Sequence, residues 1–190
     1  MEESKFQELL AVNKAVIVHF SHFAEMAHAV EFPCDLQHAI SAFENETRSC
    51  CAISPGHSMD LPGAVGVIFA PTFEQVLSVL AHDSGSSDFG GTENSGGNFP
   101  TEKTIVDSFD APYGGYNEWR IRGAKPIGIF VANPSDITVK KKQELSFNGE
   151  HIVTFGCESI SLSSVHSSFL DLQIFTMSPN GLVKITPIDT

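Results

Sequence analysis

The stretch 113–123, Tyr-Gly-Gly-Tyr-Asn-Glu-Trp-Arg-Ile-Arg-Gly, followed at 126–131 by Pro-Ile-Gly-Ile-Phe-Val, decides the fold that this sequence predicts. After its glycines, polar and apolar residues alternate, and residues two apart share one face of a strand. The polar face would carry Tyr116, Glu118, Arg120 and Arg122. Trp119 and Ile121 would point into a core. The pattern therefore presents a carboxylate at the mouth of a glycine-rich loop.

Three further apolar runs of strand length precede this stretch. They are 15–21, 48–53 and 64–69. Short apolar runs of this kind favour buried strands. Before them, Phe6, Leu9 and Leu10 lie at helical spacing, so the segment 3–12 is predicted to be an amphipathic helix. Helices early in the chain and strands late make the predicted fold class α+β.

Two helices are expected between the first two strands. They cover 23–30 and 35–46 and are separated at Pro33, because proline disfavours helical backbone in the residue before it. Asp35 is the predicted N-cap of the second helix, since a short carboxylate accepts hydrogen bonds from free amides at a helix start.

The following segments carry weaker signals. Thr72 and Gln75 stand in the reciprocal positions of a capping box, whereas the run 76–80 has the composition of a strand, so helix and strand both stay open here. Between 82 and 115, glycine, serine and asparagine replace most apolar residues. We expect one long loop there, because a segment with so little to pack is normally a functional lid or disordered.

Beyond residue 136 the sequence predicts short strands and turns. Asn148-Gly149 accepts the positive φ of a hairpin turn, and Pro179-Asn180-Gly181 is a second turn signal. The strands expected to pair are 144–147 with 151–155, and 170–177 with 182–188. A length of 190 residues is typical of a single domain, here with a candidate catalytic portion at about 15–132 and a β-rich portion at 136–190.

Composition argues against several classes of protein. The net charge of −12 opposes a nonspecific grip on nucleic acid, and the cluster Lys140-Lys141-Lys142 is expected at a solvated strand edge or turn. The four cysteines lack Cys-x-x-Cys spacing, so we expect free thiols and no metal site. An acidic N-terminus, and no run of about 18 apolar residues, predict a cytosolic chain without a membrane segment.

The order of these motifs resembles the ADP-ribosyltransferase fold. Val-His-Phe-Ser-His at 18–22 looks like the histidine-bearing variant of the family's first strand, and Arg-Ser-Cys-Cys-Ala-Ile at 48–53 looks like its hydroxyl-bearing strand. A strand that starts at Glu118 after a loop, with Ile-Gly-Ile-Phe-Val at 127–131 behind it, is similar to the end of the catalytic portion. The resemblance covers about residues 15–132 and implies a split pair of small antiparallel sheets with N-terminal helices, gripping NAD in a cleft.

The resemblance also implies roles for particular residues. Glu118 would be the catalytic carboxylate, stabilising positive charge that develops on the ribose as nicotinamide leaves. It would also accept a proton from the incoming nucleophile. The residues implied to bind NAD are His19, Ser21, Ser49, Tyr113 and Tyr116. The implied function is mono-ADP-ribosylation of a macromolecule by a toxin or effector, with a neutralising antitoxin or immunity partner, or a secretion route, to protect the producing cell.

The sequence departs from the family pattern in two places, and this bears on which molecule accepts the ADP-ribose. The expected Ser-Thr-Ser triplet is Ser-Cys-Cys at 49–51, and Tyr116 stands two positions before Glu118, where arginine-modifying transferases usually carry an acid. The second departure argues against arginine as the acceptor. Nucleic acid, another side chain and simple hydrolysis of NAD stay open.

Two other functions stay open as well. Cys50 or Cys51 would be the nucleophile of a cysteine hydrolase or deamidase. Its base would be His57 or His82, oriented by Asp83. A non-enzymatic alternative is an acidic immunity or antitoxin-like protein that binds a basic partner by charge complementarity.

Overall fold

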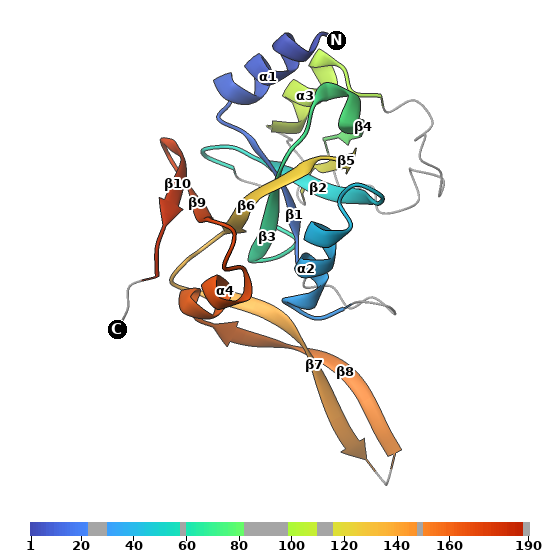
Figure 1. Cartoon of the computed structure of the whole chain (residues 1–190), viewed down its shortest axis with the longest axis vertical. Helices are drawn as coiled ribbons and strands as arrows, with labels where there is room; N and C mark the ends of the chain where they lie inside the picture. The colour runs from blue at the N-terminus through green and yellow to red at the C-terminus, as the bar shows by residue number, and fades with distance from the viewer. Residues whose placement is uncertain (23–29, 58–59, 82–98, 110–115, 148–149, 188–190) are drawn as a thin grey trace.

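The computed structural model of the chain is shown in Figure 1. It describes residues 1–22, 30–57, 60–81, 99–109, 116–147 and 150–187. Within these ranges the chain forms four α-helices, one short 3-10 helix and ten strands, so it is a mixed α+β protein dominated by sheet. None of the helices in the same ranges is both long and apolar enough to cross a membrane.

Eight of the strands form one sheet in the order β10-β9-β6-β3-β1-β2-β5-β4. Their bounds are β1 Val16–Phe20, β2 Thr47–Ile53, β3 Val65–Ala70, β4 Val76–Leu80, β5 Glu118–Arg122, β6 Lys125–Val131, β9 Ile174–Ser178 and β10 Gly181–Ile185. All neighbours are antiparallel except β6 and β9, which run parallel. One eight-stranded sheet therefore stands where two small sheets were expected.

The register of β2 divides this sheet at its centre. β2 pairs with β1 through its second half, where the paired residues end at Val18 and Cys51, and with β5 through its first half, Thr47 to Cys50. On its other side β1 pairs with β3 from Ile17 to Phe20. The backbone ladder between β1 and β2 thus stops before His19 on β1 and Cys50 on β2, one residue from Ser49.

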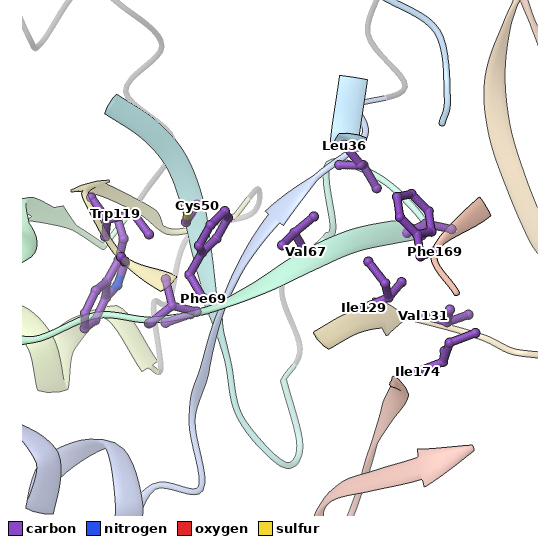
Figure 2. Packing of buried hydrophobic residues seen from close by; sticks show 14 of the residues in the cluster. Leu36, Cys50, Val67, Phe69, Trp119, Ile129, Val131, Phe169 and Ile174 are labelled. Atoms are coloured by element: carbon purple, nitrogen blue, oxygen red, sulfur yellow. The ribbon is translucent and has the colours of Figure 1, made fainter. Parts of the chain in front are cut away.

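The helices contribute to the core on one face of the sheet. They are α1 Glu3–Val12, α2 Cys34–Ser41, α3 Glu102–Phe109 and α4 Leu162–Ser168. Their buried side chains pack with the sheet residues that alternate inward, such as Trp119 and Val67. Figure 2 shows this packing, with Trp119 and Phe69 at one end of the row and Val131 and Ile174 at the other. Burial of this apolar face is the main stabilising contribution to the fold.

A smaller cluster covers the second face. Its buried members are Val18, Phe20, Cys51, Ile53, Ile68 and Phe130. Alternation along β5 puts Glu118 on this second face, because Trp119 lies in the first cluster. The predicted burial of Trp119 and Ile121 is confirmed, since each is at most 1% exposed.

Several predicted elements are confirmed near their expected bounds. The helix at 3–12 and the strands β1, β2 and β3 form as the apolar spacing indicated. Both signals at 72–80 are realised in turn: a 3-10 helix, Phe73–Gln75, is followed at once by β4. The Thr72 N–H donates to Gln75 Oε1 (2.9 Å), and that bond holds the short turn before the strand begins.

Other predictions were wrong. α2 ends at Ser41 instead of 46, and its N-cap is Pro33, so Asp35 lies in the first turn and accepts from the Leu36 amide (2.7 Å). Part of the expected long loop is α3, which Thr101 begins by accepting from the Thr104 amide (3.1 Å). α4 was also missed, although Ser161 caps it in the usual way. The expected helix at 23–30 lies almost wholly outside the described residues.

A separate two-stranded sheet consists of β7, Ile137–Phe147, and β8, Glu150–Ile160. The Asn-Gly hairpin prediction is confirmed in its strand pairing, but the strands have 11 residues each instead of four or five. Figure 1 shows this hairpin projecting away from the sheet. Lys140 was expected in solvent but is only 4% exposed, with its Nζ 5.2 Å from the centre of the Phe155 ring.

Candidate functional site

The carboxylate of Glu118 is buried at the first position of β5. Only 6% of the residue is exposed, and glutamate is rarely this buried unless it has polar partners. Its described hydrogen bond comes from Ser49, whose Oγ donates to Glu118 Oε1 across the β2–β5 pair (2.8 Å). A hydroxyl bond of this kind fixes one carboxylate oxygen and leaves its negative charge in place.

His19 reaches the same serine from the other side. Its Nδ1 lies 2.7 Å from the main-chain oxygen of Ser49. That carbonyl lies where the β1–β2 ladder stops, so the imidazole takes the place of the next main-chain bond. Ser49 thereby joins His19 and Glu118, the three residues that the sequence put forward from β1, β2 and β5.

The protonation of His19 follows from its surroundings. Burial lowers its pKa to about 4, against the raising effect of the bond to Ser49, and the nearby charges of Arg48 and His22 lower it further. The ring is therefore neutral near pH 7. Because a carbonyl oxygen can only accept, Nδ1 carries the proton and Nε2 is left as an acceptor. The site thus offers a neutral acceptor and a carboxylate joined through one serine.

Positive charge is also close to this site. Arg48 precedes Ser49 on β2, and its side chain is only 13% exposed. Its Nη2 is 2.7 Å from Glu46 Oε2, and Glu46 also faces Nε2 of His38 (3.1 Å). A half-buried guanidinium so placed contributes to the field felt by His19.

Tyr116, two residues before Glu118, forms an aromatic pair with His22. Their ring centroids are 6.2 Å apart and the rings are nearly perpendicular. Tyr116 also packs against the cluster on the second face, two residues from Glu118. An aromatic side chain therefore stands two positions before Glu118, where the predicted family pattern would have an acid.

Two remaining predicted residues are not brought to Ser49 in the same way. Ser21 is 4% exposed and follows β1, and its amide donates to the Val65 oxygen of β3 (2.9 Å). Tyr113 lies outside the described residues. The structure therefore joins His19, Ser49 and Glu118 by hydrogen bonds and adds Tyr116 through its place in the chain and its packing.

The cysteine alternative gains no support from the geometry. Cys50 is 1% exposed, and burial raises the pKa of its thiol well above the ordinary value, which disfavours the thiolate. Neither ring nitrogen of His57 has a hydrogen-bond partner in the described part of the chain. His82 and Asp83 lie outside that part. All four cysteines are free thiols, as the sequence predicted.

Two residues of the site were missed by the sequence prediction. His22 was noted only as part of a motif, and Asn117 was not singled out, yet Asn117 is completely buried between Tyr116 and Glu118. A signal for Asn117 was present: asparagine has low strand propensity, so its place at the start of a strand indicates a special hydrogen-bonding role.

A cleft elsewhere in the molecule does not coincide with this site. It has a volume of about 610 Å³ and lies at the opposite end of β1, between α1 and the β9–β10 hairpin. Its lining includes Lys14, Val16 and Leu182 but none of His19, Ser49 and Glu118. Among the described residues, no group of three or more His, Cys, Asp or Glu side chains is arranged to hold a metal ion.

Comparison with known proteins adds no assignment. No family model, curated protein or solved structure matches this chain. The function proposed below therefore depends on the geometry of the site and on the motifs that predicted it.

Proposed function

We propose that this chain is an NAD-dependent ADP-ribosyltransferase, acting as a toxin or effector, and that its sheet is a variant of the ADP-ribosyltransferase fold. The observation that carries the proposal is the bond from Ser49 Oγ to Glu118 Oε1, with His19 on the carbonyl of the same serine. The sequence motifs single out the same three residues. Adjacent strands supply them in the order histidine, hydroxyl, carboxylate, which supports the resemblance.

The reaction breaks the bond between the nicotinamide nitrogen and C1′ of the ribose. The bonding electrons leave with nicotinamide, and positive charge develops on the sugar, much as in glycoside cleavage. Glu118 would lie beneath that sugar, where its negative charge stabilises the transition state more than the substrate. The acceptor then attacks C1′ and gives its proton to the same carboxylate.

The neighbouring groups have roles that follow from their chemistry. Ser49 donates to Glu118 and so holds one carboxylate oxygen in a fixed direction. Neutral His19 can accept a hydrogen bond from a ribose hydroxyl through Nε2. Tyr116 offers a ring face or edge to nicotinamide. NAD is the substrate in this scheme, and a neutralising partner would protect the producing cell.

The test compares wild-type protein with Glu118→Gln, which keeps shape and removes charge. Nicotinamide release from NAD is measured by chromatography, and ADP-ribose attached to extract components is measured by mass spectrometry. We expect the substitution to lower kcat by about 100-fold or more, because a charge that acts mainly in the transition state is lost. Glu158→Gln, on the exposed hairpin, is the matched control and should retain wild-type rates.

The outcomes separate the candidate functions. Attached ADP-ribose that disappears in Glu118→Gln supports transfer, whereas free ADP-ribose alone supports hydrolysis by the same carboxylate. A wild-type protein that releases no nicotinamide contradicts the proposal. If the inactive protein instead forms a stable one-to-one complex with a basic partner protein, the alternative of an immunity or antitoxin-like binding protein takes its place.

A further inference from the structure

The side chain of Asn117 makes three hydrogen bonds in a completely buried position. Its Oδ1 accepts from the Ala52 amide (2.7 Å), and its Nδ2 donates to the Ala52 carbonyl (2.9 Å) and to the Ser108 carbonyl (2.8 Å). The side-chain amide of Asn117 therefore links the residue before Glu118 to both β2 and the last turn of α3.

Only an asparagine fits this set of partners. One partner is a donor and two are acceptors, and a side-chain amide of this length has one acceptor oxygen and two N–H donors. The amide also has a single possible orientation, since the reverse one would set its oxygen against two carbonyl oxygens. Aspartate has the same shape but would place negative charge against the oxygens of Ala52 and Ser108, in a position where no water replaces the lost bonds.

These bonds replace main-chain pairing at the start of β5. The β2–β5 register runs from Thr47 with Arg122 to Cys50 with Trp119. The N–H and C=O of Ala52 come next on the side of β2 that faces β5, and the Asn117 side chain binds both. The backbone can leave the ladder before Glu118 without leaving the Ala52 groups unsatisfied. Glu118 is the first residue after this anchor.

The third bond fixes the anchor from outside the sheet. Ser108 is completely buried near the end of α3, and its carbonyl is the second acceptor of the Asn117 amide. Trp119, on the other side of Glu118, donates from Nε1 to Ser108 Oγ (3.0 Å). Ser108 thus uses two different groups: its carbonyl binds the Asn117 anchor, and its hydroxyl binds Trp119.

We propose that Asn117 is a positioning residue that sets the direction of the Glu118 carboxylate toward Ser49 and the reacting sugar. The effect of Asn117 on catalysis rests on the proposed function, whereas its effect on the direction of the Glu118 carboxylate does not. Asn117 lies between Tyr116 and Glu118, and its three bonds restrict the backbone from which Glu118 projects. Loss of the two donated bonds lets the start of β5 shift, and a shift of about 1 Å at a catalytic group costs up to about 100-fold in rate.

The experiment compares Asn117→Asp and Asn117→Ser with the control Ser108→Ala. The control removes the hydroxyl that donates to Ile105 (2.7 Å) and accepts from Trp119, but keeps the carbonyl that binds Asn117. All variants are assayed for nicotinamide release well below their melting temperatures. For the Asn117 variants we expect kcat to fall about 10- to 100-fold. We expect KM for NAD to stay within about threefold, since Asn117 is not proposed to touch the substrate.

The control decides whether the loss is merely structural. Ser108→Ala disturbs the same buried region, so a fall in kcat equal to that of the Asn117 variants would overturn the proposal. Wild-type kcat in both Asn117 variants would overturn it too. If Asn117→Asp does not fold, Asn117→Ser decides, because it introduces no charge.

A crystal structure of the variants separates this inference from the proposed function. In an Asn117 variant we expect Ser49 Oγ and Glu118 Oε1 to move beyond hydrogen-bonding distance, whereas Ser108→Ala should keep their 2.8 Å separation. If the wild-type protein proves inactive on NAD, the proposed function is lost and this distance alone decides the positioning role. An unchanged distance between Ser49 Oγ and Glu118 Oε1 in the Asn117 variants overturns the positioning role of Asn117.

Discussion

The junction of β1, β2 and β5 and the β7–β8 hairpin are both antiparallel pairings, but they are built in opposite ways. In the hairpin, main-chain partners continue without interruption from Ile137 with Ile160 to Phe147 with Glu150. At the junction β1 and β2 pair over only three residues, and side chains contact β2 on both of its sides beyond the paired residues. The regular pairing is exposed over its outer part, whereas the interrupted pairing is buried.

The difference in burial between the two regions indicates which polar side chains are candidates for a function. On the outer part of the hairpin even the apolar Leu145 and Val153 are 52% and 53% exposed, whereas Lys140 near its base is buried over the Phe155 ring. At the junction Asn117 and Glu118 are buried, which costs free energy unless each polar group is paired. A buried hydrogen-bonded set of this kind at an interrupted ladder is a functional-site candidate, whereas a regular exposed ladder is not.

The largest expected effect comes from emptying the core beneath the junction. Trp119→Ala removes a side chain that is completely buried and that packs with Phe6 and Phe109. We expect the free energy of unfolding to fall by about 3–5 kcal/mol, measured by urea denaturation. Trp119→Phe keeps most of the volume and should cost clearly less. Equal losses for the two variants would mean that the Nε1 bond to Ser108, not packing, holds this region.

A second effect concerns pH and follows from the burial of His19 at the junction. The pKa of His19 is about 4 in the folded protein, below its ordinary value of 6.5. The unfolded chain therefore binds more protons between these values, and stability present above pH 6.5 is lost as pH falls toward 4. His19→Asn should remove up to about 1.4 kcal/mol per pH unit of this dependence. Denaturation at pH 7, 6, 5 and 4.5 checks it, and parallel curves for the two proteins would contradict it.

The smallest effect is expected on the hairpin. Val153→Thr changes an exposed side chain on β8 to a polar one of the same shape. The free energy of unfolding should change by no more than about 0.5 kcal/mol, and nicotinamide release should stay at the wild-type rate. A loss above about 1 kcal/mol would show that Val153 is buried against something, and the contrast between the two regions would then weaken.

Much of the fold could be predicted because its signals are local. The helix 3–12, the strands around His19 and Glu118, and the Asn-Gly hairpin follow from the spacing of apolar residues and from turn chemistry within a few positions. α3 was missed because its segment is polar overall and only Ile105 and Ser108 are buried, so its start depends on the Thr101 cap. α4 was missed for the same reason, since most of its residues are serines.

The candidate site could likewise be predicted only in part. The types and order of His19, Ser49 and Glu118 are visible in the sequence, because each occurs at a definite place in a predicted strand. Their hydrogen bonds are not visible, because they join residues up to 69 positions apart and depend on which strands are neighbours. The buried anchor of Asn117 depends on the same arrangement, since it needs β2 and α3 to meet at one side chain.

The sequence by itself determined most of the strand segments, the first helix, the acidic charge and the residues able to carry out the proposed chemistry. Only the tertiary structure decided that Ser49 binds His19 through its carbonyl and Glu118 through its hydroxyl. The physical reason is the distance along the chain over which each interaction acts. Alternation and capping act within one element, whereas a buried polar group is satisfied by partners that the folding of distant strands brings within about 3 Å.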